Sequence, residues 1–203
     1  MTRAPTTSTG HRRSERKAQT RQTLIDTALR LIAKDGFDAI TTDDIAAAAG
    51  VSPRTFFRYF PTKESVLLYG EDHFISSFTG VYLAQPEQAE IDAIVAAFVA
   101  LAPGISHLHG RIRLYHKALT TSYVLRGQEQ AYHEENVARV ASAIARRRGR
   151  SRPDTSCSLL AAVCMTTLQT ATSEWAAGPA RVDLRKVIEN HFALLLQLVA
   201  PSR

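Results

Sequence analysis

The stretch "AGVSPRTFFRYFPTK", residues 49–63, places four aromatic residues within five positions and sets two arginines beside them. Phe56 and Phe60 are four residues apart and therefore lie on one face of a helix, which favours burial of that face. Arg54 and Arg58 fall on the remaining faces. Because arginine side chains match guanine edges and phosphates, the exposed side of this helix is typical of a surface that contacts DNA.

A short helix is predicted immediately before this stretch. Thr41 or Thr42 can cap its N-terminus, and Asp44, three residues after Thr41, forms a capping box and suits the positive end of the helix dipole. Gly50 ends the helix, because the turn that follows needs a residue that tolerates a positive φ angle.

The next helix begins with Ser52 as its N-cap and Pro53 as its first residue, where the missing N–H costs nothing. Ala46 is small enough for two helices to cross closely, and Phe56 anchors the second of them. Small and apolar residues follow the spacing of a helix-turn-helix through both helices: Ile45, Ala46, Ala49, Gly50, Val51 and Phe56.

Positive charge is concentrated at the start of the chain. The 203 residues carry a formal net charge of +6, and residues 1–22 contain one acid, Glu15, against six bases: Arg3, Arg12, Arg13, Arg16, Lys17 and Arg21. We expect residues 1–13, which lack helical periodicity, to form a flexible basic arm that adds phosphate or minor-groove contacts.

The remainder of the chain is predicted to be helical, so the fold class is all-α. No segment shows sustained two-residue alternation, and the apolar residues recur at helical spacing. Three parts are expected: the arm 1–13, a helix-turn-helix DNA-binding domain over 14–62, and a regulatory domain over 63–203. The predicted helices after the first three cover about 63–83, 87–102, 105–126 with a possible break, 128–148, 154–177 and 182–199.

The segment "RQTLIDTALRLIAKDGFDAITTDDIAAAAGVSPRTFFRYFPTKESVLL", residues 21–68, resembles the tetracycline-repressor (TetR) family of bacterial transcriptional regulators. The resemblance implies a homodimer with N-terminal DNA-binding helices and a C-terminal domain that holds a small-molecule pocket and the dimer interface. Position 57 is commonly tyrosine in this family, so Phe57 should contribute packing without a phosphate hydrogen bond. Transferred position by position, the resemblance implies DNA contacts at Thr42, Ser52, Arg54, Thr55, Phe57, Tyr59 and Lys63.

The last two helices carry apolar residues on more than one side, which indicates burial on more than one side. The family resemblance explains this as a four-helix interface between two copies, and an ordinary core within one chain is the alternative. The expected interface residues are Leu160, Cys164, Leu168, Trp175, Ile188, Phe192 and Leu195.

Mixed aromatic and polar side chains suggest a ligand pocket in the regulatory domain. Tyr115, His116 and Tyr123 stand close together in sequence, and Gln169 is a further candidate. The alternative is a core whose polar groups form hydrogen bonds within the protein.

The sequence offers little support for other chemistry. The histidines near position 110 have no cysteine or acid at ligand spacing, so we expect no metal and no cofactor. Cys157 and Cys164 are interpreted as small buried residues, and the arginine-rich run 146–152 as solvated surface. No catalytic motif and no apolar segment of membrane-spanning length are present, so we expect a cytoplasmic protein without enzymatic activity or membrane association.

These observations predict a regulator, most simply a repressor, that binds a pseudo-palindromic site in double-stranded DNA and is released by a small-molecule effector. Two copies of the recognition helix would enter major grooves about 34–36 Å apart. Arg54 is expected to read a base, whereas Phe57, Tyr59 and Lys63 would position the DNA backbone. The alternatives are an activator, an effector-independent regulator, or a helical small-molecule-binding protein without a specific DNA site.

Overall fold

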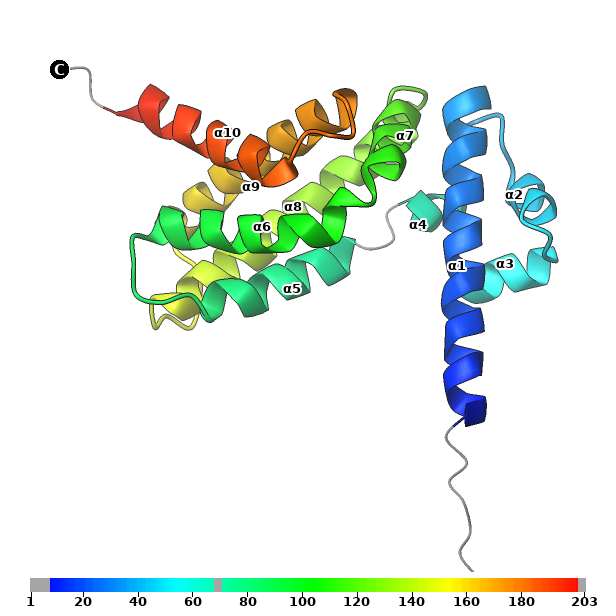
Figure 1. Ribbon diagram of the computed structural model, residues 1–203, viewed down its shortest axis with the longest axis horizontal. Helices are drawn as coiled ribbons and strands as arrows, with labels where there is room; N and C mark the ends of the chain where they lie inside the picture. Colours follow the sequence, from blue (N-terminus) through cyan, green and yellow to red (C-terminus); the bar gives the residue numbers. More distant parts are fainter. Residues whose placement is uncertain (1–7, 68–70, 201–203) are drawn as a thin grey trace, which may run out of the picture.

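The structure, a computed structural model, describes residues 8–67 and 71–200 (Figure 1). Within these two ranges the chain forms ten helices and no strand, which confirms the predicted all-α class. Figure 1 shows two helical bodies, with α1 to α4 in one and α5 to α10 in the other.

The first body is built on one long helix. α1 (Ser8–Asp35) packs against the shorter α2 (Thr42–Ala48) and α4 (Lys63–Leu67), while α3 (Pro53–Tyr59) packs against α2. The predicted helix-turn-helix is therefore present as α2 and α3.

Local sequence sets the ends of these short helices, as predicted. Thr41 and Asp44 form the capping box: the Thr41 amide donates to Asp44 Oδ2 at 2.9 Å, and the Asp44 amide donates to Thr41 Oγ1 at 3.1 Å. The hydrogen bond from the Thr41 hydroxyl lowers the pKa of the Asp44 carboxyl. Gly36 and Gly50 adopt φ angles of +92° and +70°, which side-chain-bearing residues rarely adopt.

The core of this body confirms the burial predicted for the two phenylalanines. Phe56 and Phe60 are 0% and 2% exposed, and their ring centroids lie 6.0 Å apart. Each buried ring of this size contributes roughly 1.5–3 kcal/mol of apolar burial. The same core includes Val66 and Leu67 of α4, so it extends past the domain boundary predicted at residue 62.

α1 starts earlier than the sequence suggested. The prediction of a flexible arm over residues 1–13 is wrong for its second part, since α1 begins at Ser8 rather than near Ser14. Arginine and lysine are good helix formers, and extending an existing helix adds one hydrogen bond per residue fixed. The first part of the predicted arm, residues 1–7, lies outside the described residues.

The second body contains six helices. They match the predicted order of helices but differ in several bounds; the helix predicted over 87–102, for example, covers Glu90–Ser106. The segment predicted as one helix over 63–83 appears as α4 and α5, on either side of residues 68–70, which are outside the described ranges. The break expected within 105–126 lies at Thr120–Ser122, and the helix after it begins five residues before the predicted start. The bounds are α5 (Glu71–Leu83), α6 (Glu90–Ser106), α7 (His109–Leu119), α8 (Tyr123–Arg147), α9 (Thr155–Ala177) and α10 (Leu184–Val199).

Aromatic rings form the centre of this second core. Phe78 stacks on Phe98 with ring centroids 4.6 Å apart, and Phe98 lies 6.0 Å from Phe192 of α10. Trp175 of α9 is 2% exposed, donates its indole N–H to the carbonyl of Val182 at 2.8 Å, and so joins α9 to the loop before α10.

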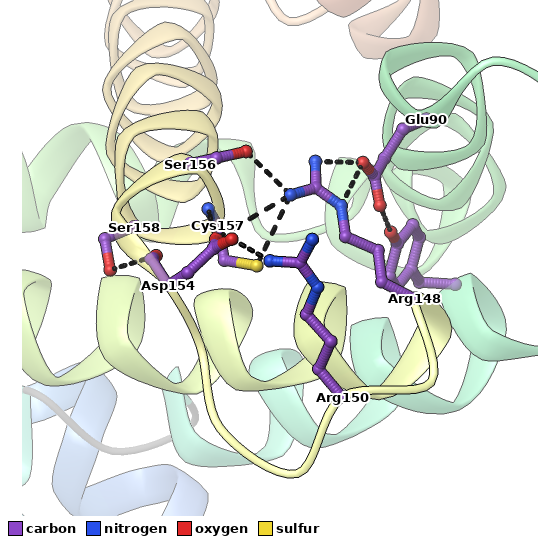
Figure 2. Close-up of polar contacts among 8 residues, drawn as sticks. Glu90, Arg148, Arg150, Asp154, Ser156, Cys157 and Ser158 are labelled. Carbon is purple, nitrogen blue, oxygen red and sulfur yellow. Dashed lines mark hydrogen bonds and ion pairs between the residues drawn. The ribbon is translucent and has the colours of Figure 1, made fainter.

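The arginine-rich run 146–152 is more structured than the solvated surface that the sequence suggested. Arg147 donates to the backbone carbonyls of Tyr82 and Gln85 at 2.9 and 3.0 Å. Arg148 forms an ion pair with Glu90 and donates to the Ser156 hydroxyl at 2.7 Å (Figure 2). These guanidinium groups therefore hold together the ends of α5, α6, α8 and α9.

In the described part of the chain, no single helix has the length and apolar character to cross a membrane. α6 and α7 meet those criteria only when they are joined, and they are bent by 96° where they meet.

Candidate nucleic-acid interface

The side of α3 opposite the buried phenylalanines faces solvent. Arg54 is exposed and Thr55 is partly buried, whereas Phe56 between the two faces is fully buried. Ser52 accepts the amide of Thr55 at 3.2 Å, and the two hydroxyl oxygens lie 3.0 Å apart. The cap thus fixes the first turn of α3 and presents Arg54 from an ordered backbone.

Phe57 and Thr42 occupy the edges of the same surface. Phe57 is 52% exposed, and its ring meets that of Phe56 edge to face at a centroid distance of 5.4 Å. A phenyl ring exposed to this extent supplies apolar contact and no hydrogen bond. Thr42 is partly buried as the first residue of α2.

Two guanidinium groups lie near the ring of Tyr59. The Cζ atoms of Arg58 and Arg21 are 5.3 and 5.6 Å from the centre of its ring. Such cation–π contacts contribute about 0.5–1 kcal/mol at exposed sites. Arg21 belongs to α1, so the end of α3 and the middle of α1 share one cationic surface.

Lys63 has a structural role that the sequence did not reveal. Its ammonium donates to the backbone carbonyls of Phe37 and Ile40 at 2.6 and 2.8 Å and lies 4.0 Å from the centre of the Phe37 ring. Lys63 therefore ties the start of α4 to the loop between α1 and α2. Two of its three donors are engaged within the domain, which leaves one for a phosphate.

α7 joins this body to the regulatory body. Its C-terminal half packs into the first core, and the Thr121 hydroxyl that follows it accepts the amide of Phe37 at 3.1 Å. The Ser122 hydroxyl donates to Asp38 at 3.2 Å, and Arg111 forms a 2.7 Å ion pair with Asp26 of α1. A displacement of α7 would thus be transmitted directly to α1 and to the loop that Lys63 holds.

Comparison with known proteins agrees with this geometry. The family model described as "Bacterial regulatory proteins, tetR family" matches residues 24–69, and the model described as "MftR C-terminal domain" matches residues 88–200, more than half of the chain. The chain belongs to the TetR family.

Individual curated relatives match over short stretches of the chain. The transcriptional regulator MftR of Mycobacterium tuberculosis is 41% identical over 51 residues, which are 25% of this chain and 26% of that protein. The HTH-type transcriptional regulator EthR of Mycolicibacterium smegmatis is 49% identical over 45 residues, 22% of this chain and 21% of that protein. The chain thus aligns with about a quarter of the length of these curated relatives.

A solved structure extends the likeness to the whole TetR-family fold. Thermus thermophilus FadR, a TetR-family transcriptional repressor determined in complex with lauroyl-CoA, is 25% identical. The alignment covers 90% of this chain and 96% of that chain with a TM-score of 0.56.

Most of the residues predicted for the TetR-type dimer interface lie in the core of the single chain. Five of them are 0–7% exposed within the single chain and belong to its own core, and the other two pack against that core. The stripe was predicted correctly to be buried, but α9 and α10 pack against each other and against α6, α7 and α8 of the same chain. The fully buried residues are Cys164, Leu168, Trp175, Ile188 and Phe192; those packed against the core are Leu160 and Leu195.

A second apolar stripe faces outward on the last two helices, which the sequence predicted to be apolar on more than one side. Leu159 and Val163 of α9 are 63% and 43% exposed, and Leu194 and Leu198 of α10 are 53% and 74% exposed. We call these four residues the outer apolar face. Their spacing is as regular as that of the buried stripe, so the pattern itself does not distinguish an internal face from an external one.

The structure also separates the four residues predicted to line a pocket. Tyr123 is 87% exposed at the start of α8, where Arg126 lies 4.2 Å from its ring, and Gln169 donates to Glu129 on the surface at 2.8 Å. Tyr115 packs against the core of the DNA-binding body.

His116 is adjacent to Tyr115, with ring centroids 5.9 Å apart, and burial lowers the pKa of its imidazole. The four predicted residues therefore do not line one cavity in this structure, because Tyr123 of α8 and Gln169 of α9 lie on the surface while Tyr115 of α7 packs against the first core.

Proposed function

We propose that this TetR-family chain is a cytoplasmic transcriptional repressor that binds a pseudo-palindromic DNA operator as a homodimer and leaves it when a small molecule binds the regulatory domain. The observation that carries this proposal is α3. One side of the helix is a buried phenylalanine pair, while the other carries an exposed arginine from a capped first turn.

The residues of α3 differ in the contacts they can make with DNA. Arg54, exposed on the first turn, has the fork geometry for the O6 and N7 atoms of guanine, and Thr55 and Ser52 can donate or accept beside it. Phe57 has only apolar surface to offer to sugars or a thymine methyl group. Tyr59, Thr42 and the remaining donor of Lys63 are assigned to the sugar–phosphate backbone.

The base-reading role of Arg54 is tested by Arg54→Ala on an operator selected in vitro. The variant should lose discrimination at one base pair of each half-site, at a cost of about 1–3 kcal/mol per bidentate contact. Arg113→Ala removes the same charge from an exposed position of α7 and should leave both affinity and base preference unchanged. Loss of affinity in Arg54→Ala without any change of base preference would contradict the assignment.

The homodimer is assigned to the outer apolar face. Four large apolar side chains on two adjacent helices would remain in water in a monomer, and burying them against the same face of a second copy forms a four-helix contact. Leu194→Glu should convert the dimer to a folded monomer, measured by sedimentation, and weaken operator binding. Val124→Glu places the same charge at a 59% exposed position of α8 and should leave the dimer intact.

Effector control is assigned to α7, which contacts the DNA-binding body through Arg111 and its C-terminal half and contacts α9 through His109. His109 at its first turn is 7% exposed, and its Nε2 lies 3.0 Å from the carbonyl oxygen of Trp175. An effector that prefers a shifted α7 would move α1 and thereby the distance between the two recognition helices. The size of this response is limited by the difference in effector affinity between the two states.

Acyl-CoA esters are the first compounds to test, since the FadR relative was determined with lauroyl-CoA. Release of labelled operator by a CoA ester, with no effect of free CoA, would support effector control. If no ligand changed operator binding, the protein would be an effector-independent regulator.

A further inference from the structure

The N-terminal part of α1 extends beyond the core that its C-terminal part helps to build. α1 begins at Ser8, but its first fully buried residue is Leu24. At 1.5 Å per residue the intervening segment is roughly 24 Å long. In Figure 1 this segment continues past α3, and its side chains from Arg12 to Gln19 are exposed.

A groove runs between this extension and the C-terminal end of α3. Its volume is about 670 Å³, four of its seven lining residues are cationic, and none is acidic. We call it the basic groove. Its lining residues are Arg13, Ser14, Arg16, Lys17 and Thr20 from α1, with Arg58 and Tyr59 from α3.

The three cations that α1 contributes to the basic groove share one helical face. Arg13, Arg16, Lys17 and Thr20 follow the spacing i, i+3, i+4 and i+7, so they project together into the groove. Like charges at this spacing destabilise a helix by about 0.2–0.5 kcal/mol per pair. An anion that lies along this face of α1 would offset the repulsion between these cations.

The position of the groove identifies that anion. Arg58 and Tyr59 belong to α3, one turn beyond Arg54 and Thr55, so the groove continues the surface assigned above to DNA. The DNA backbone beside the major groove presents a row of phosphates. A row of phosphates matches a straight row of cations better than a single compact anion does. The hydroxyl of Ser14 adds a hydrogen-bond donor for a phosphate oxygen, whereas the Thr20 hydroxyl donates to the carbonyl of Arg16 at 2.9 Å.

We propose that the basic groove holds the sugar–phosphate backbone of the DNA that flanks each half-site, with the extension of α1 acting as a rigid outer support for the duplex. This proposal rests on the proposed function, since it places the groove on the same DNA that α3 reads. It predicts that the bound duplex extends outward beyond the base pairs that determine specificity.

The experiment uses the full-length protein and an operator obtained by selection with the wild type. Arg13→Gln, Arg16→Gln and Lys17→Gln are combined in one variant; Arg16 and Lys17 are exposed and glutamine is a good helix former, so the helical circular dichroism should not change. A control variant combines Arg113→Gln, Arg152→Gln and Arg181→Gln, which remove the same charge from exposed positions outside the groove.

Affinity is measured as a function of salt concentration on a long duplex and on one cut at the ends of the half-sites. The wild type should bind the long duplex more tightly, and the groove variant should bind both equally. On the long duplex the groove variant should lose about 0.9 from the salt slope for each contact removed, roughly 5 for the six cations of a dimer. Its base preference should equal that of the wild type, and the control variant should retain the wild-type slope.

Two results overturn the proposal. If the groove variant kept the wild-type salt slope and the wild-type preference for the long duplex, the basic groove would not bind DNA, and an acidic protein would be the better candidate partner. The proposed function would still stand. Equal losses in the groove and control variants would show a general effect of net charge. Failure of the wild type to select any operator would instead refute the proposed function itself.

Discussion

Lys63 allows a sharp test of how the DNA-binding body is held together. Replacing it by methionine keeps most of the apolar stem and removes the ammonium. The change breaks two hydrogen bonds, to the carbonyls of Phe37 and Ile40, and the contact of the charge with the Phe37 ring.

The expected loss can be estimated from these contacts. A hydrogen bond from a charged donor is worth about 1.5–3 kcal/mol when it is buried and less when water reaches it. Lys63 is partly buried, and both carbonyls can recover some bonding to water, so we expect a net destabilisation of about 2–3 kcal/mol. For a chain of this length this corresponds to a fall in Tm of roughly 4–12 °C.

The assay is thermal unfolding followed by circular dichroism in the absence of DNA, where a role in phosphate binding has no influence. Lys117→Met, at an exposed position of α7, is the matched control and should leave Tm within about 1–2 °C of the wild type, as surface substitutions generally do. If Lys63→Met unfolded at the same temperature as the control, the structural role of Lys63 would be refuted, and a purely DNA-facing role would be the better description.

Three further predictions follow from the caps and the cores. Thr41→Val removes the hydroxyl of the capping box and should lower the free energy of unfolding by about 1 kcal/mol in a urea titration; a fully stable variant would contradict the box. Cys157 and Cys164 are 0% exposed, and burial raises the pKa of the Cys164 thiol to about 12, so a thiol reagent at neutral pH should label neither cysteine until the protein unfolds. Labelling of the native protein would contradict their burial. Trp175, the single tryptophan, is 2% exposed inside the chain, so its fluorescence should be blue-shifted equally in the wild type and in the Leu194→Glu monomer. A red shift of the fluorescence on dimer dissociation would indicate that Trp175 is buried by the partner subunit and therefore lies in the dimer interface.

The DNA-binding body was largely predictable because its determinants are local. The Thr41–Asp44 box, the Ser52 cap and the positive φ of Gly50 each depend on residues within four positions of one another. The burial of Phe56 and Phe60 follows from their helical spacing in the same way. What the sequence did not show here is long-range: the bond from Lys63 to the carbonyl of Phe37 spans 26 residues.

The helices of the regulatory body were predictable from the sequence, but which face of each helix is buried was not. Leu159 and Leu160 are neighbours on α9, yet one is 63% exposed and the other packs against the core. Which of two apolar stripes turns inward depends on how α9 sits against α8 and α10, and that is fixed by contacts far apart in sequence. The same reason separates Tyr123 from Tyr115, which were predicted to line one pocket.

The proposed function requires two copies of α3 to read DNA together. Selection of the wild-type protein on a random duplex library, at about 150 mM salt where exposed charges are well screened, tests it most directly. A dimer should enrich an inverted repeat whose half-site centres lie about one helical turn, or a multiple of it, apart. Recovery of only single, unpaired sites, or of no sequence beyond salt-sensitive retention, would contradict the proposed function.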